Sequence, residues 1–139
     1  MGKWIKPDLN TKFHIDFDWW EKEGRNLRVF LHSQLCSDCQ AMYASHKGTE
    51  FIDWVDPDTA EVQQVDGLWH ALRTHCSLLP TYIDEHTPLT TAIFRVFLAN
   101  GNKPLSANEL AAIIGKSRPE TILRTIAGRR VYKGIKPVE

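Results

Sequence analysis

The stretch SANELAAIIGKSRPETILRTIAG, residues 106–128, carries the same local signal twice. Ser106 is followed three residues later by Glu109, and Ser117 is followed three residues later by Glu120. In such a pair the serine hydroxyl accepts a hydrogen bond from the third helical N–H, while the glutamate accepts one from the serine N–H. Each pair precedes apolar residues at helical spacing. The stretch therefore predicts two short helices in close succession.

These two helices are expected to span about residues 107–114 and 118–127, with Gly115 in the turn between them. Glycine readily adopts the left-handed backbone that such a turn often needs. Two helices joined by a short glycine-containing turn form a helix-turn-helix. The second helix has an apolar face made of Pro119, Ile122, Leu123, Ile126 and Ala127. Its opposite face is polar and basic, as a helix that enters the major groove of DNA requires, and consists of Thr121, Arg124, Thr125 and Gly128, with Arg118 near the start.

The charge of the chain is unevenly distributed. The whole sequence has 17 Lys/Arg and 17 Asp/Glu, but residues 101–139 carry eight Lys/Arg and only three Asp/Glu. Four of these cations follow the second predicted helix, within GRRVYKGIKPVE, where Lys133-Gly134 fits a tight turn: Arg129, Arg130, Lys133 and Lys136. A basic segment on an otherwise acidic chain is typical of a nucleic-acid face, although ordinary variation also produces such an imbalance.

Residues 85–139 resemble a winged-helix domain. The resemblance depends on a helix over 87–100, a short strand KPL over 103–105, the two capped helices, and RRVYKGI as a returning strand and wing. It implies binding of double-stranded DNA, with base or phosphate contacts from Arg118, Thr121, Arg124 and Thr125, and phosphate contacts from Arg129, Arg130, Lys133 and Lys136. The family pattern is not completed at the end of the sequence, because a full second wing strand does not follow. Winged helices also serve as protein-interaction modules, and that function is the alternative.

Residues 1–84 resemble no family as a whole and predict a β-rich part, so the expected fold class is α+β with domains over 1–84 and 85–139. The alternation in FHIDFDWW, residues 13–20, predicts a half-buried strand, and LRVFLHS, residues 27–33, predicts its hairpin partner. Trp19 and Trp20 would then face opposite sides, which makes the exposed one a candidate for a homodimer interface. The remaining predictions are a short helical stretch after residue 36, a hairpin over 51–66 with Ala60 where glycine would be easier, and a helix over 67–79.

Three cysteines suggest a metal site. Cys36 and Cys39 have the Cys-x-x-Cys spacing with which two thiolates bind one tetrahedral ion, and Cys76 is a candidate third ligand. His70 shares the predicted 67–79 helix with Cys76 and is the expected fourth ligand, whereas His75 is directly adjacent to Cys76, which makes joint ligation awkward. The pattern predicts a structural Cys3His zinc site. Two ordinary cysteines near a turn and a buried Cys76 are the alternative.

A second resemblance concerns the same cysteines. A strand at 27–33, the Cys-x-x-Cys motif, a helix and a later proline are similar to part of a thioredoxin domain. This resemblance implies a thiol-disulfide oxidoreductase in which Cys36 attacks, Cys39 resolves and Pro80 faces them as a cis-proline. The predicted hairpin over 51–66 and the helix over 87–100 do not fit that fold.

Other function classes have little support in the sequence. No apolar run approaches the roughly 20 residues of a membrane span, and no apolar signal segment follows the N-terminus. The sequence has no phosphate-binding loop, nucleophile elbow or His-Glu-x-x-His motif, so we expect no enzyme. An odd number of cysteines favours the reducing cytoplasm. The leading hypothesis is a cytoplasmic DNA-binding protein that regulates transcription.

Overall fold

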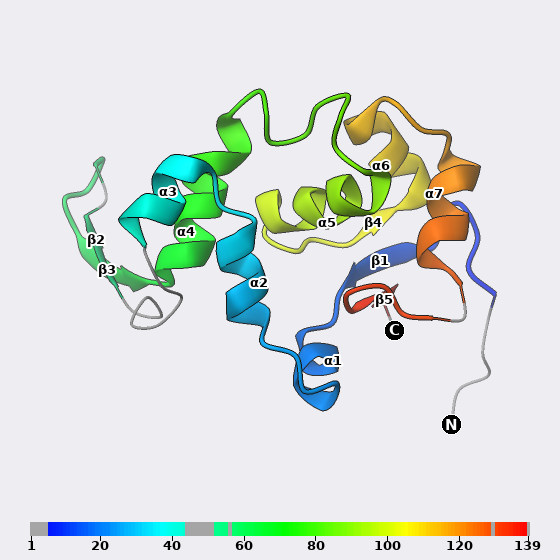
Figure 1. The fold of residues 1–139 in the computed structure, drawn as a ribbon, viewed down its shortest axis with the longest axis horizontal. Helices are drawn as coiled ribbons and strands as arrows, with labels where there is room; N and C mark the ends of the chain where they lie inside the picture. The colour runs from blue at the N-terminus through cyan, green and yellow to red at the C-terminus, as the bar shows by residue number, and fades with distance from the viewer. Residues whose placement is uncertain (1–5, 44–51, 56, 129, 139) are drawn as a thin grey trace. The chain divides into compact units, whose positions relative to one another are not determined.

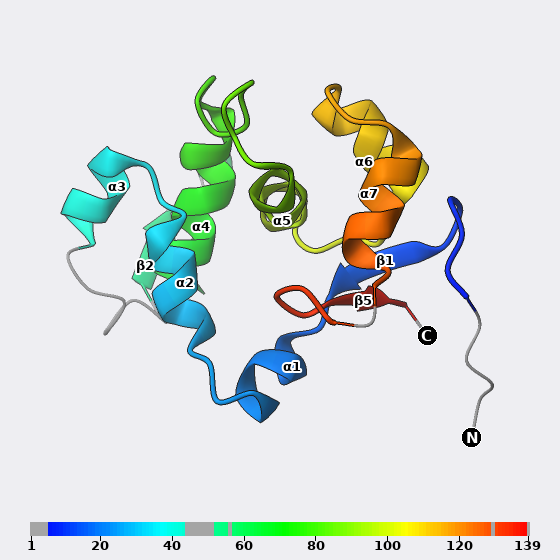
Figure 2. The same ribbon diagram turned by 45° about the vertical axis from the view of Figure 1, so that its right-hand side comes forward.

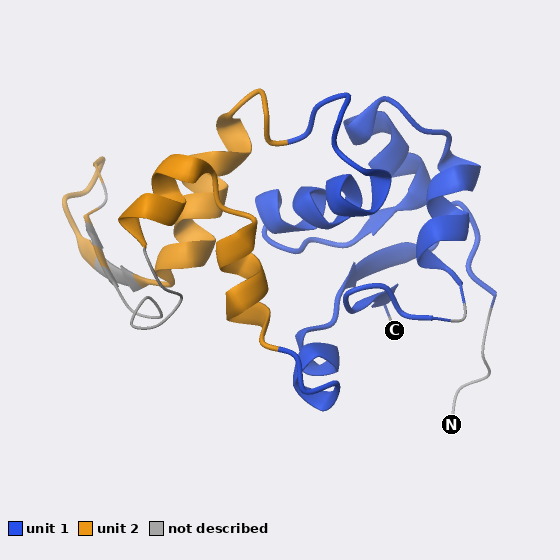
Figure 3. Cartoon of the chain, viewed as in Figure 1, with its two compact units in different colours: residues 1–25, 83–139 blue, residues 26–82 orange. Residues whose placement is uncertain are grey.

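The computed structural model describes residues 6–43, 52–55, 57–128 and 130–138. It has the predicted α+β composition and divides into two compact units (Figure 3). Unit 1 consists of residues 1–25 and 83–139, and unit 2 consists of residues 26–82. The expected division into 1–84 and 85–139 therefore differs at the N-terminus, where residues up to 25 belong with the C-terminal part.

A three-stranded antiparallel sheet explains this division. Strand β1 (Lys12–Ile15) lies between β4 (Leu105–Ser106) and β5 (Ile135–Pro137). Phe13 pairs with Leu105 on one side and with Pro137 on the other. The side chains of Phe13 and Ile15 are buried, so the predicted alternation holds over these four residues.

The predicted strand over residues 13–20 is correct only as far as Ile15, because Asp16 begins a helix. The Asp16 side chain accepts a hydrogen bond from the Asp18 N–H and caps α1 (Phe17–Lys22). In this helix Trp20 is buried and donates its indole N–H to the Lys133 carbonyl at 3.0 Å. Trp19 is half-buried and meets Trp20 edge to face. The homodimer interface expected at an exposed tryptophan stays a prediction.

Three helices lie on one face of this sheet in both views (Figures 1 and 2): α5 (Leu89–Ala99), α6 (Ala107–Ile114) and α7 (Pro119–Ile126). Helix α5 buries more residues than α6 or α7, namely Ala92, Ile93, Phe94, Val96, Phe97 and Leu98. Helices α6 and α7 pack against each other and bury Leu110, Ile122 and Ile126. The turn between α6 and α7 begins at Gly115, whose φ of 78° is the left-handed conformation expected there. The two predicted helices and the glycine turn between them are thus present.

Only the first of the two predicted capping boxes forms. The Glu109 N–H donates to Ser106 Oγ at 3.2 Å, and the Ser106 N–H donates to Glu109 Oε1 at 3.1 Å. Helix α7 instead begins at Pro119, with Arg118 at the N-cap position and no side-chain cap. Proline suits the first helical position because it has no N–H to satisfy, and this moves the N-cap one residue beyond Ser117.

This difference predicts unequal effects of two serine substitutions. Ser106→Ala should lower the free energy of unfolding by about 1–2 kcal/mol, because it removes a cap from a buried helix end. Ser117→Ala is the matched control and should change it by less than about 0.5 kcal/mol. Urea denaturation of the full chain measures both. Equal losses in the two variants would show that Ser117 also caps its helix.

Unit 2 contains three α-helices, a hairpin and a short 3₁₀ turn among its described residues. In chain order these are α2 (Leu27–Ser33), α3 (Ser37–Met42), β2 (Ile52–Val55), β3 (Val62–Val65), α4 (Gly67–Thr74) and η1 (Cys76–Leu78). The predicted hairpin is confirmed, with Val55 paired to Val62. Ala60 in its loop has a φ of 59°, where glycine would be unstrained, as expected.

The segment LRVFLHS is a helix and not the predicted strand. The Asn26 side chain accepts hydrogen bonds from the Arg28 and Val29 N–H groups and so caps α2. Leu27 and the buried Leu31 are four residues apart and share one helix face. Arg28 forms an ion pair with Asp66, which in turn caps α4. The strand required before the Cys-x-x-Cys motif by the thioredoxin resemblance is therefore replaced by a helix.

Among the described residues, no helix combines the length and the apolar character that a membrane crossing requires.

Candidate functional site

Four side chains of unit 2 form a cluster that is compatible with a structural metal site. They are Cys36, Cys39, His75 and Cys76, and their ligand atoms all lie within 4.8 Å of one another. His75 Nδ1 is 3.4 Å from Cys36 Sγ and 3.5 Å from Cys39 Sγ. The Cys36 N–H points at Cys76 Sγ, at a distance of 3.3 Å. The sequence predicted the three cysteines of this cluster.

Two breaks in the helical backbone bring these residues together. Cys36 occupies the N-cap position of α3 with extended backbone angles, and Cys39 lies in the first turn of the same helix. On the other side, α4 ends at Thr74, and His75 has φ −128° and ψ −63° before η1 begins at Cys76. The site is therefore built from one helix start and one helix end.

The fourth member is His75 and not the predicted His70. His70 lies within α4, five positions before His75, which corresponds to about 7 Å along a helix axis. His75 lies outside the helix, so its side chain and that of Cys76 do not diverge as neighbouring residues on a helix would. Joint ligation by His75 and Cys76 would be awkward on a continuous helix. Because the backbone turns at His75, both side chains can reach the same site.

The thiols of the cluster have different proton affinities. For Cys36, burial opposes ionisation, but hydrogen bonds from the Cys39 N–H and from the neighbouring thiols and imidazole outweigh it and lower its pKa to about 7. Burial and the adjacent thiols raise the pKa of Cys39 to about 12, and burial also raises the pKa of Cys76. Without a cation, Cys39 and Cys76 therefore remain protonated. A bound dication would reverse this, because coordination deprotonates thiols outright.

Two of the distances between donor atoms match those around a tetrahedral ion. With metal–sulfur distances of about 2.3 Å, metal–nitrogen distances of about 2.0 Å and tetrahedral angles, each sulfur–nitrogen edge is about 3.5 Å. The two distances from His75 Nδ1, 3.4 and 3.5 Å, are close to this value. Cys39 and Cys76 are almost completely buried, while Cys36 is partly exposed and His75 is exposed. An ion could therefore enter from the side of Cys36 and His75.

The described residues expected to contact DNA belong to unit 1 and lie at the start of α7, on α7, on the loop that precedes β5 and on β5. Arg124 is exposed on α7, and Arg118 is exposed at its N-cap, where Arg118 Nε lies 3.8 Å from Glu120 Oε2. The Thr125 hydroxyl donates to the Thr121 carbonyl at 2.8 Å, so it is turned toward its own helix. The two arginines are therefore the groups of α7 best placed to approach an anionic ligand.

The cations after α7 have different environments. Arg130 is exposed and Lys133 is half-buried, and both lie on the loop before β5, whereas Arg129 lies outside the described residues. Lys136 lies on β5, and its ammonium forms an ion pair with Asp16 at 3.1 Å. This pair lowers the pKa of Asp16, mainly through the hydrogen bond from Lys136. Lys136 is thus engaged within unit 1, and the basic surface is narrower than the sequence implied.

Comparison of the chain with protein-family models, with curated proteins and with solved structures finds no match.

Proposed function

We propose that the protein binds double-stranded DNA through unit 1, and that unit 1 is a winged-helix domain with a permuted chain order. The observation that carries this proposal is the position of β1. Strand β1 pairs antiparallel with β5, in the place that a second wing strand takes in a winged helix. The Val138 N–H also donates to the Lys12 carbonyl at 2.8 Å, so the end of β5 lies beside the start of β1. Strand β1 would thus take the role of the second wing strand.

The helix-turn-helix supports the same function. The inner face of α7 is held against α6 by Ile122 and Ile126, which leaves Arg118 and Arg124 on the solvent side. A helix supported in this way can enter a major groove, where arginine binds guanine O6 and N7 or the flanking phosphates. Arg130 and Lys133 add positive charge on the neighbouring loop, the expected position of the wing.

We further propose that Cys36, Cys39, His75 and Cys76 bind one Zn²⁺. Three thiolates and one imidazole are a ligand set that zinc prefers, and four protein ligands leave no coordination position for a substrate. The ion would accordingly be structural and would stabilise unit 2. Three free cysteines in such a site suit a reducing compartment, for which we propose the cytoplasm.

Replacement of one arginine tests the role of α7. Arg124→Ala should weaken binding to a fluorescently labelled duplex about tenfold at low salt, since a contact from a recognition helix is worth about 1–3 kcal/mol. Fluorescence anisotropy of the full chain measures the affinity. Lys103→Ala is the matched control, because Lys103 is exposed in unit 1 but precedes β4, outside the proposed surface, and it should change the affinity less than twofold. Equal losses for both variants would indicate a general charge effect and would exclude recognition by α7.

A protein-interaction module with the same fold is the second candidate. Ile113 on α6 is 56% exposed, so it offers an apolar contact to a partner. The duplex titration separates the two functions. Absence of duplex binding at low salt by a folded protein would favour the interaction module.

A further inference from the structure

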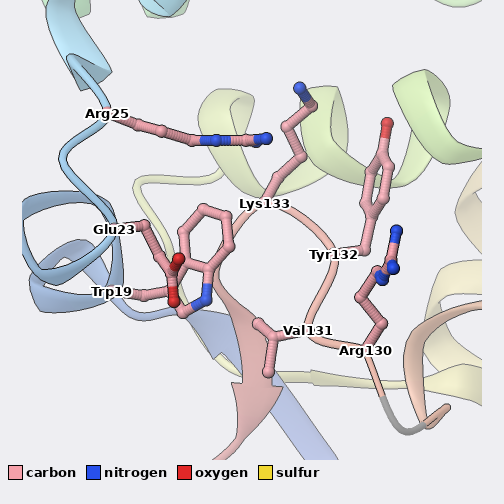
Figure 4. Close-up of a pocket in the computed structure, with 7 residues that line it drawn as sticks. All are labelled: Trp19, Glu23, Arg25, Arg130, Val131, Tyr132 and Lys133. Atoms are coloured by element: carbon pink, nitrogen blue, oxygen red, sulfur yellow. The ribbon is translucent and has the colours of Figure 1, made fainter.

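Unit 1 contains a pocket that shares Arg130 and Lys133 with the proposed duplex surface but is otherwise lined by residues outside it. It has a volume of about 530 Å³ and is lined by residues from two distant parts of the chain (Figure 4). The first part is α1 with the turn after it, and the second is the loop before β5. The lining residues are Trp19, Glu23, Arg25, Arg130, Val131, Tyr132 and Lys133. This volume lies within the range of about 300–1,000 Å³ that is typical of small-molecule sites.

The lining combines cations with aromatic rings. The Arg25 guanidinium lies 5.5 Å from the centre of the Trp19 ring, and the Lys133 ammonium lies 5.9 Å from the centre of the Tyr132 ring. Arg130 adds a third cation, against the single carboxylate of Glu23. Figure 4 shows both rings and all three cationic side chains around the same space. A ligand that suits this lining is both anionic and flat.

The loop that forms one wall of the pocket is fixed by hydrogen bonds. Lys133 and Gly134 have φ values of 51° and 83°, which form the tight turn that the sequence predicted. The Asp16 N–H donates to the Gly134 carbonyl at 2.7 Å, and the Trp20 indole donates to the Lys133 carbonyl. A left-handed backbone at a lysine is unfavourable, and such strain is concentrated at functional sites. The wall is thus formed before any ligand binds, which lowers the entropic cost of binding.

We propose that this pocket binds a nucleotide. The base would stack against the aromatic side chains, and the phosphate would pair with arginine, whose planar fork matches phosphate oxygens. The Glu23 carboxylate is an acceptor for an exocyclic amino group such as that of adenine or cytosine. The nucleotide is either free or an unpaired unit of a single strand, and the chemistry of recognition is the same. Binding here does not depend on docking of α7 in a duplex.

Calorimetric titration of the full chain tests the proposal with three probes. Deoxyadenosine 5′-monophosphate should bind at least tenfold more tightly than either deoxyadenosine or inorganic phosphate, because only the nucleotide engages rings and cations together. Equal affinity for the nucleotide and inorganic phosphate would show a simple anion site and overturn the proposal. Absence of nucleotide binding up to about 1 mM would overturn it as well.

Substitution of Arg25 tests whether binding occurs in this pocket. Arg25→Gln should weaken nucleotide binding at least fivefold, whereas Lys22→Gln, at an exposed position of α1 that does not line the pocket, should leave it unchanged. Thermal denaturation of both variants checks that the fold is intact. Unchanged nucleotide affinity in the Arg25→Gln variant would place the binding elsewhere and overturn the proposal.

Two further comparisons identify the source of the nucleotide and separate this site from duplex binding. A short single-stranded oligodeoxyadenylate that binds tenfold more tightly than the mononucleotide would identify a strand as the ligand, and equal affinity would identify the free nucleotide. Both results support the pocket. Arg25→Gln should leave duplex affinity unchanged, while Arg124→Ala should leave nucleotide affinity unchanged, so either proposal can fail without the other.

Discussion

If the proposed zinc ion is bound, its removal is expected to unfold unit 2 of the full chain, while the amides of unit 1 keep their protection from hydrogen exchange. A segment of this length has a core that supplies only about 3–5 kcal/mol. Binding of a structural zinc ion contributes about 10–16 kcal/mol near neutral pH. The ion would therefore decide whether unit 2 folds. A chelator followed by hydrogen exchange measures the effect, and added zinc should reverse it.

A pair of histidine substitutions is the control for this result. His75→Ala removes one of the four clustered ligand atoms, and it should lower the zinc content from one ion per chain and destabilise unit 2. His70→Ala, the ligand expected from the sequence, should retain one ion per chain. Elemental analysis of the purified variants distinguishes them. Loss of zinc from the His70 variant with retention in the His75 variant would contradict the observed arrangement, and a stable, metal-free protein with intact Cys36 and Cys39 would contradict the zinc site altogether.

Substitution of Gly134 is expected to cause the largest loss of stability from a single added methyl group. A Cβ atom at this position would lie 2.8 Å from the Asp16 carbonyl oxygen and 3.1 Å from Trp20 Nε1. The first of these neighbours is backbone and cannot move without breaking the pairing between β1 and the loop. The φ of 83° adds strain for any residue with a Cβ. We expect Gly134→Ala to lower the free energy of unfolding by about 3 kcal/mol or more.

Gly24 offers a matched control for that substitution. Its φ of 66° is also positive, but a Cβ there would meet no atom within 4 Å. Gly24→Ala should therefore cost only the backbone strain, about 1–2 kcal/mol. Urea denaturation of both variants gives the comparison. A loss for Gly134→Ala no larger than that for Gly24→Ala would show that the loop is not held against Asp16 and Trp20.

Local features of the fold could be predicted from the sequence because they depend on neighbouring residues. The capping box at Ser106, the left-handed turn at Gly115 and the positive φ at Ala60 follow from side-chain chemistry within a few positions. Residues 17–20 and 27–33 are helical where the sequence predicts strands, because short apolar runs do not distinguish a strand from a helix. Their cap residues, Asp16 and Asn26, were the available signal for helices.

Contacts between distant parts of the chain could not be predicted from local sequence patterns. The insertion of β1 between β4 and β5 pairs Phe13 with Leu105 and Pro137, and no local pattern encodes such a partner. The pocket depends on the same pairing, since it joins Trp19 to Tyr132. At the metal cluster, the three cysteines were predictable from residue type, but the choice of His75 depends on how the backbone turns after Thr74.

The salt dependence of duplex binding tests the central claim most directly. Each phosphate contact by a lysine or arginine releases counterions, so the slope of log K against log salt concentration is about −0.9 for each contact. Contacts from Arg118, Arg124, Arg130 and Lys133 together predict a slope of about −3 to −4 for the full chain. A measured slope in this range supports DNA binding through α7 and the loop before β5. A slope near zero, or no binding at low salt by the folded protein, would contradict it.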